Sequence, residues 1–131
     1  MKVNVSVVIV NEEKILIMKR PDDDKHFPGF WGIPGGGMEE GDESVEFTAE
    51  REVKEELGLE IHANKLIDSN KYKDVLFLVA DGWLEENANK VPTLSEEAAD
   101  FKWASLSDVM KLEFTPFTKN RIIDYMSKKS D

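Results

Sequence analysis

The residues best suited to chemistry are glutamates that crowd the segment from Gly37 to Glu60. This segment holds ten acidic and two basic residues, so eight of the chain's ten net negative charges fall within 24 residues. At about 100° per residue, Glu52, Glu55 and Glu56 lie within an arc of about 100° on one side of a helix. Hard divalent cations prefer several carboxylate oxygens. The pattern therefore predicts a cation site, or alternatively a solvated acidic face.

A helix over residues 44–57 is expected to position these glutamates. Apolar side chains recur at four-residue spacing along it, and Gly58 follows where a C-terminal cap is expected. The apolar stripe consists of Val45, Ala49, Val53 and Leu57. Ser44, or alternatively Asp42, suits the N-cap, because a short polar side chain can accept an N–H bond from the first turn. The stripe would hold the helix on a sheet and leave its glutamates at the edge of the core.

The other elements are expected to be strands with few helices. Alternating apolar residues predict a β-hairpin from residues 3–9 and 15–18. Residues 21–37 form an ordered loop rich in proline, glycine and aromatic side chains, and residues 75–80 a strand buried on both faces. The remaining expected elements are strands at 31–33, 60–67, 72–84 and 101–103, a polar loop at 85–100, and helices at 106–112 and 116–126. This order indicates one α/β domain over residues 1–131.

The composition limits the classes of partner. The chain has 131 residues, of which 40% are hydrophobic and 34% charged, with a net charge of -10; its pI is about 4.7. This acidic balance disfavours polymeric nucleic acid and anionic membranes. The chain has no cysteine, which excludes disulfides and thiolate chemistry. Its apolar runs are too short to span a bilayer and it lacks the features of a signal peptide, so we expect a cytoplasmic protein with no membrane partner.

The segment from Gly37 to Leu59 resembles the Nudix box. That signature consists of Gly, five residues, Glu, seven residues, Arg-Glu, an aliphatic residue, any residue, Glu-Glu, any residue, Gly and an aliphatic residue. The chain matches it at Gly37, Glu43, Arg51, Glu52, Val53, Glu55, Glu56, Gly58 and Leu59. Residues 31–36, Trp-Gly-Ile-Pro-Gly-Gly, also resemble the family's entry into the box. The length and fixed spacing make this a specific signature.

The resemblance implies a Nudix-type α/β/α sandwich with a mixed sheet between helices. It also implies hydrolysis of a nucleoside diphosphate linked to another group, with Mg²⁺ or Mn²⁺ required. The implied metal ligands are the Gly37 carbonyl oxygen and the carboxylates of Glu52, Glu55, Glu56 and Glu97. Glu52 or a neighbouring glutamate would take the proton from water. Bound metal would neutralise the pyrophosphate, which an acidic site cannot do alone.

The resemblance also implies an ion pair between Glu43 and Arg51 that fixes the loop against the helix. Gly58 completes the structural residues of the motif. Glu96 is the alternative to Glu97 as the downstream acid, and a solvated loop is the alternative for both.

Four residues outside the box are candidates for substrate binding. Lys19 and Arg20 end a strand beside the proline- and glycine-rich loop and could bind phosphate. Phe27 and Trp31 could stack on a base, although aromatic residues in ordered loops also pack into the core.

The expected reaction converts a nucleoside triphosphate or deoxynucleoside triphosphate to the monophosphate and pyrophosphate. Hydrolysis of ADP-ribose or another nucleotide sugar is the alternative, but the proline typical of many ADP-ribose hydrolases is absent, with Asp74 and Val75 at that distance from the box. A non-catalytic nucleotide-binding regulatory module is a second alternative, although none of the box glutamates is lost. The resemblance also allows a homodimer.

Overall fold

The structure, a computed structural model, describes residues 1–129. Its elements are β1 (Lys2–Asn11), β2 (Lys14–Lys19), β3 (Trp31–Gly32), β4 (Gly35–Gly37), α1 (Val45–Leu57), β5 (His62–Tyr72), β6 (Val75–Trp83), β7 (Asp100–Ala104), α2 (Leu106–Lys111) and α3 (Thr118–Lys129). Seven strands form one sheet in the order β3-β2-β1-β6-β5, with β4 also paired to β1 and β7 to β2. Only the β1–β6 pair is parallel among these strands, so the sheet is mixed.

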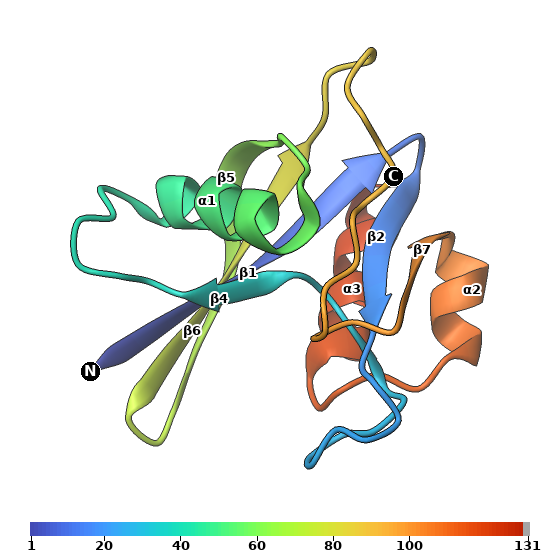
Figure 1. The fold of residues 1–131 in the computed structure, drawn as a ribbon, viewed down its shortest axis with the longest axis horizontal. Coiled ribbons are helices and arrows are strands. Elements are labelled where there is room, and N and C mark those ends of the chain that lie inside the picture. The colour runs from blue at the N-terminus through green and yellow to red at the C-terminus, as the bar shows by residue number, and fades with distance from the viewer. Residues whose placement is uncertain (130–131) are drawn as a thin grey trace.

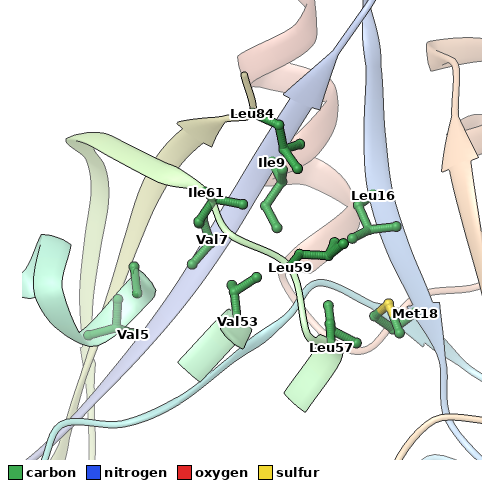
Figure 2. Packing of buried hydrophobic residues seen from close by; sticks show 11 residues of the cluster. Val5, Val7, Ile9, Leu16, Met18, Val53, Leu57, Leu59, Ile61 and Leu84 are labelled. Atoms are coloured by element: carbon green, nitrogen blue, oxygen red, sulfur yellow. The ribbon is translucent and has the colours of Figure 1, made fainter. Parts of the chain in front are cut away.

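The sheet lies between helices, because alternate residues of its central strand enter two separate cores. Val5, Val7 and Ile9 of β1 pack with Val53 and Leu57 of α1 (Figure 2). The residues of β1 and β2 that face the other way pack with α2 and α3; this second core contains Val8, Ile15, Ile17, Val79, Val109, Ile122 and Met126. Figure 1 shows the same arrangement of α1 and α3 around the sheet. The expected α/β/α sandwich is confirmed.

Local sequence explains the predicted elements that the structure contains. The β1–β2 hairpin turns at Glu12 and Glu13, which both have positive φ, as a two-residue hairpin turn requires. Ser44 is the N-cap of α1, and its hydroxyl accepts the N–H of Phe47 at 3.0 Å. Gly58 ends the helix in the left-handed conformation, with φ of 68°. The stripe of apolar residues thereby faces the sheet.

Several predicted bounds and one predicted burial pattern differ from the structure. β5 continues to Tyr72 rather than ending at residue 67, because β5 is an edge strand whose polar, exposed side chains carry no alternating pattern. The segment 75–80 is buried on both faces only from Leu78 onward, since the tip of the β5–β6 hairpin projects beyond the helices (Figure 1). The last helix begins at Thr118 rather than residue 116, because Phe117 adopts a positive φ of 69°.

Within residues 1–129, no helix is both long and apolar enough to cross a lipid bilayer.

Candidate active site

A glycine in β4 allows the Glu52 carboxylate to lie directly against the sheet. A Cβ atom on Gly36 would fall 2.3 Å from the Glu52 Cδ and Oε2 atoms, so no larger residue fits there without displacing this carboxylate. Gly35 is equally restricted, because its Cβ would lie 2.2 Å from the Val5 carbonyl oxygen of β1. Two neighbouring glycines therefore let β4 pass between β1 and the Glu52 side chain.

Arg51 connects the loop before α1 to the predicted metal ligands. Its guanidinium donates to both Asp42 carboxylate oxygens, at 3.0 and 2.8 Å. It also donates to the Gly37 carbonyl oxygen at 3.2 Å, and to Glu52 and Glu55 at 3.1 Å each. The strong pairing with Arg51 holds the pKa of Asp42 well below its ordinary value, and the N–H of Glu39 lowers it further.

The predicted ion pair between Glu43 and Arg51 was wrong. The Asp42 side chain, only 4% exposed, occupies the position expected for Glu43, while Glu43 is exposed. Asp42 also accepts the N–H of Glu39 and the Thr48 hydroxyl, which places it inside the turn before the helix. Motif spacing identified an acid at this corner of the loop but not which of two adjacent acids turns inward.

Glu56 is crowded by other carboxylates. It shares a cavity of about 420 Å³ with Glu52, Glu55, Glu96 and Glu97, which we name the carboxylate cavity. Burial raises the pKa of Glu56 to about 8, and a hydrogen bond with Glu52 and the nearby charges of Glu52, Glu97 and Glu55 add to the effect. A cation would relieve the repulsion among these carboxylates.

The loop that carries Glu96 and Glu97 is attached to the site at both ends. The Thr93 N–H donates to the Leu57 carbonyl oxygen at 2.8 Å, at the end of α1. The Ala99 N–H donates to the Lys19 carbonyl oxygen at 2.8 Å, at the end of β2. These two bonds hold the loop over the carboxylate cavity, which explains how acids about forty residues after the box come to lie beside Glu56.

The oxygen atoms of this site suit a divalent cation. The Arg51 guanidinium touches the Gly37 carbonyl, Glu52 and Glu55, so a positive charge is already stabilised by three of the predicted ligands. All the candidate ligands are hard oxygen donors. In the described part of the chain, no three acidic side chains stand close enough together to enclose a metal as they are placed. The donor set therefore fits a divalent cation in its chemistry, and Glu52 already forms a hydrogen bond with Glu56.

A larger cavity extends from the carboxylates toward the end of β2. This central cavity has a volume of about 630 Å³, and its lining includes the carboxylates of Asp24, Glu56, Glu96 and Glu97 and the cations of Lys19 and Arg20. The structure thus places the two predicted phosphate-binding cations in the same space as the carboxylates. Cations and carboxylates that line one cavity suit a ligand that carries both phosphate and metal.

A third cavity, the aromatic cavity, lies over the face of the sheet opposite α1. It has a volume of about 660 Å³, and Phe27, Tyr72, Phe77 and Phe117 contribute its aromatic side chains. Arg20 lines both this cavity and the central cavity. The two cavities therefore adjoin each other, and Arg20 is the charged residue that they share, beside Ile33 and Gly35.

Polar side chains form the floor of the aromatic cavity. Asn4 and Asn70 pair in register with Phe77 on either side, so the three side chains form one row across β1, β6 and β5. Ser6 follows on the same face. Sequence patterns did not identify Asn4, Asn70 or Phe77, because their proximity depends on the register of three strands that lie far apart in the chain.

Trp31 does not lie in the aromatic cavity. It packs against the second core, and its backbone bridges Lys19 in β2 and Phe114. Trp31 thereby joins the proline- and glycine-rich loop to the sheet, as expected of an aromatic residue that packs into the core, and its contact with a base stays a prediction. Phe27 is the member of the predicted aromatic pair that lines the cavity.

Comparisons with known proteins identify the family of this chain. A family model described as the NUDIX domain matches residues 1–125. The chain belongs to the Nudix family. It is 32% identical to a protein named nucleoside triphosphatase NudI of Escherichia fergusonii, with 88% of this chain and 89% of that protein covered. The membership makes this protein a Nudix pyrophosphohydrolase.

Solved structures share the fold. The MutT protein of Methanosarcina mazei has a TM-score of 0.75 and 24% identity, covering 99% of this chain and 95% of that one. An ADP-ribose pyrophosphatase of Streptococcus suis has a TM-score of 0.71 and 25% identity, covering 98% of this chain and 91% of that one. The Nudix fold is therefore established over nearly the whole chain, while these two neighbours differ in the substrates their names state.

Proposed function

We propose that this Nudix hydrolase converts nucleoside triphosphates or deoxynucleoside triphosphates to monophosphates and pyrophosphate, with Mg²⁺ or Mn²⁺ as cofactor. The observation that carries the proposal is the sequence of three connected cavities, which runs from carboxylates through Arg20 to an aromatic space. A nucleotide has the same order of groups: a metal-bound phosphate chain, a phosphate next to the sugar, and a flat base. The name of the relative in Escherichia fergusonii supports the triphosphate over other nucleotides.

In this proposal the glutamates bind the metal, and one of them accepts a proton from the attacking water. Glu52, Glu55, Glu56 and Glu97, with the Gly37 carbonyl oxygen, are the proposed ligands. When bound, the metal neutralises the phosphates and lowers the pKa of the attacking water. Glu52 or a neighbouring glutamate accepts the proton of that water at a carboxylate oxygen. Gly36 and Arg51 fix where the Glu52 carboxylate lies, through the close approach to β4 and the hydrogen bond at 3.1 Å.

The remaining lining residues recognise the nucleotide. Lys19 and Arg20 bind phosphate oxygens in the central cavity, since cationic donors form strong hydrogen bonds with them. Phe27 and Phe77 contact the base, and the amides of Asn4 and Asn70 are available for its polar edge. In the described residues, neither amide side chain has a hydrogen-bond partner within the protein. We also propose that the protein is cytoplasmic and that it forms a homodimer.

A panel of nucleotides tests this proposal. The eight common ribonucleoside and deoxyribonucleoside triphosphates and ADP-ribose are incubated with the protein and Mg²⁺, and pyrophosphate, phosphate and monophosphate are quantified separately. We expect equal amounts of monophosphate and pyrophosphate from at least one triphosphate, with no activity after chelation of the metal. Cleavage of ADP-ribose alone would favour the alternative suggested by the Streptococcus suis neighbour. Binding without any cleavage would identify a regulatory module.

A further inference from the structure

The loop between β2 and β3 contains a partly buried carboxylate that no role described so far uses. Asp24 lies in this loop, and its side chain is only 17% exposed although it stands among exposed polar residues. Asp22 and Asp23, its neighbours in sequence, are exposed. An acidic side chain that turns inward from a surface loop does so for its partners, because leaving water is costly for a charge without them.

Asp24 binds three groups at once. Its Oδ2 atom accepts the Nη2–H of Arg20 at 2.8 Å. Its Oδ1 atom accepts the backbone N–H groups of His26 at 2.9 Å and Phe27 at 3.0 Å. The two backbone bonds, followed by the bond with Arg20, lower the pKa of Asp24 to about 2, so this carboxylate is ionised at neutral pH. All three partners line the aromatic cavity.

Arg20 is the side chain at which the central and aromatic cavities meet. Its backbone is fixed, because its N–H donates to the Phe30 carbonyl oxygen at 2.8 Å and its carbonyl accepts the Gly29 N–H at 3.2 Å. Its guanidinium has no comparable support: among the described residues its Nε atom is buried without a hydrogen-bond partner. Asp24 is thus the group that determines where the end of the Arg20 side chain points.

We propose that Asp24 is a positioning residue that holds Arg20 at the junction of the two cavities, where Arg20 binds the phosphate next to the nucleoside. The inference rests on the proposed function, since it takes the ligand to be a nucleotide. The Asp24–Arg20 pair uses one Nη atom of the guanidinium. The N–H groups of the other Nη atom remain for a phosphate, and a guanidinium held in one orientation loses less conformational freedom when it binds.

The substitution Asp24→Asn distinguishes the positioning of Arg20 from a purely structural role of Asp24 in the loop. In Asp24→Asn, the remaining carbonyl oxygen can still accept the N–H groups of His26 and Phe27. The amide nitrogen that replaces Oδ2 cannot accept a hydrogen bond from Arg20. The variant therefore keeps the turn of the loop and releases the guanidinium. Asp22→Asn is the matched control, because it removes the same charge from the same loop and Asp22 lines neither cavity.

The experiment measures the binding of uncleavable nucleotides by calorimetry. The probes are the α,β-methylene triphosphates of the common nucleosides with Mg²⁺, so the measurement does not depend on catalysis. Four proteins complete a double-mutant cycle: wild type, Asp24→Asn, Arg20→Ala and the double variant. Asp22→Asn is measured beside them, and circular dichroism and thermal unfolding verify that each variant is folded.

We expect Asp24→Asn to weaken binding by up to about tenfold, because the released Arg20 side chain must be immobilised again when it binds the phosphate. In the Arg20→Ala background the same change should alter affinity less than about twofold, because the effect of Asp24 passes through Arg20. Asp22→Asn should bind like wild type.

Three results would overturn the inference. The first is an equal loss from Asp24→Asn with and without Arg20, which would mean that Asp24 only shapes the loop. The second is wild-type affinity in Asp24→Asn. The third is failure of the wild-type protein to bind any probe. Failure of the proposed function has a different signature, since the probes would bind while the cleavable parent nucleotides would release no pyrophosphate.

Discussion

At the scale of single residues, the site depends on the absence of a side chain at Gly36. The Glu52 carboxylate fills the space where a Cβ atom of residue 36 would lie, 2.3 Å from its Cδ. Arg51 restrains the same carboxylate from the other side, with its Nη1 atom 3.1 Å from Oε1. The position of the Glu52 carboxylate therefore depends on two residues: Gly36, whose missing side chain leaves space for it, and Arg51, which donates a hydrogen bond to it. The position of a catalytic carboxylate matters because a misplacement of about 1 Å can cost about a hundredfold in rate.

Gly36→Ala tests this placement. The added methyl group must displace the Glu52 carboxylate, since β4 is held by its pairing with β1. We expect kcat for pyrophosphate release to fall about a hundredfold while the protein stays folded. Gly32→Ala in β3 is the comparison variant: it adds the same methyl group to the lining of the central cavity, but its Cβ would meet the Thr115 hydroxyl at an ordinary 3.6 Å and not Glu52. Equal kcat values in Gly36→Ala and wild type would contradict the role given to this glycine.

At the scale of elements, the turn before α1 acts as a clamp between loop and helix. Asp42 bonds the helix through Arg51 and Thr48, and bonds its own turn through the N–H of Glu39. Arg51 then reaches the Gly37 carbonyl oxygen at the end of β4. Asp42 and Arg51 together therefore fix the loop between β4 and α1 to the helix. This pairing holds the Gly37 carbonyl near the first glutamates of the site.

The pH dependence of unfolding tests this clamp. The pKa of Asp42 is lowered in the folded protein from an ordinary value of 3.8, so its stabilisation is fully present above that value and is lost as the pH falls toward the folded pKa. Urea unfolding should show wild type more stable than Asp42→Asn at about pH 7, with the difference shrinking at about pH 3. Glu43→Gln is the control and should change the free energy of unfolding little at either pH. A difference between wild type and Asp42→Asn that stays constant with pH would contradict the clamp.

Most elements were predictable because their signals are local. The helix α1 has a complete set of such signals in its stripe, its Ser44 cap and its Gly58 end. The edge strand β5 was predicted too short, because the half-exposed face of an edge strand does not need apolar residues. The start of α3 was misplaced because the positive φ of Phe117 leaves no mark in the sequence. Propensity and periodicity report the local preference of a segment. The length of β5 and the start of α3 depend instead on the surrounding structure.

At the scale of the whole molecule, the site combines residues from six separate parts of the chain: β1, residues 19–27, residues 36–56, the β5–β6 hairpin, residues 95–97 and the loop before α3. The box glutamates were predictable because motif spacing fixes them on one helix. The aromatic cavity was not, because it depends on the register of β1, β6 and β5 and on the loop before α3. The inward turn of Asp42 in place of Glu43 likewise follows from packing. The sequence therefore predicted the glutamates of the carboxylate cavity better than the residues of the aromatic cavity.

The central claim is that the α1 glutamates are the reactive groups of a nucleotide pyrophosphohydrolase. The most direct test is the rate of pyrophosphate release with Mg²⁺, from the best triphosphate of the panel, in wild type, Glu52→Gln and Glu56→Gln. Glu60→Gln is the matched control, because Glu60 is exposed and pairs only with Lys54 among the described residues. We expect both site variants to lose about a thousandfold or more while remaining folded, and Glu60→Gln to retain its rate. Rates near that of wild type in Glu52→Gln and Glu56→Gln would contradict the account.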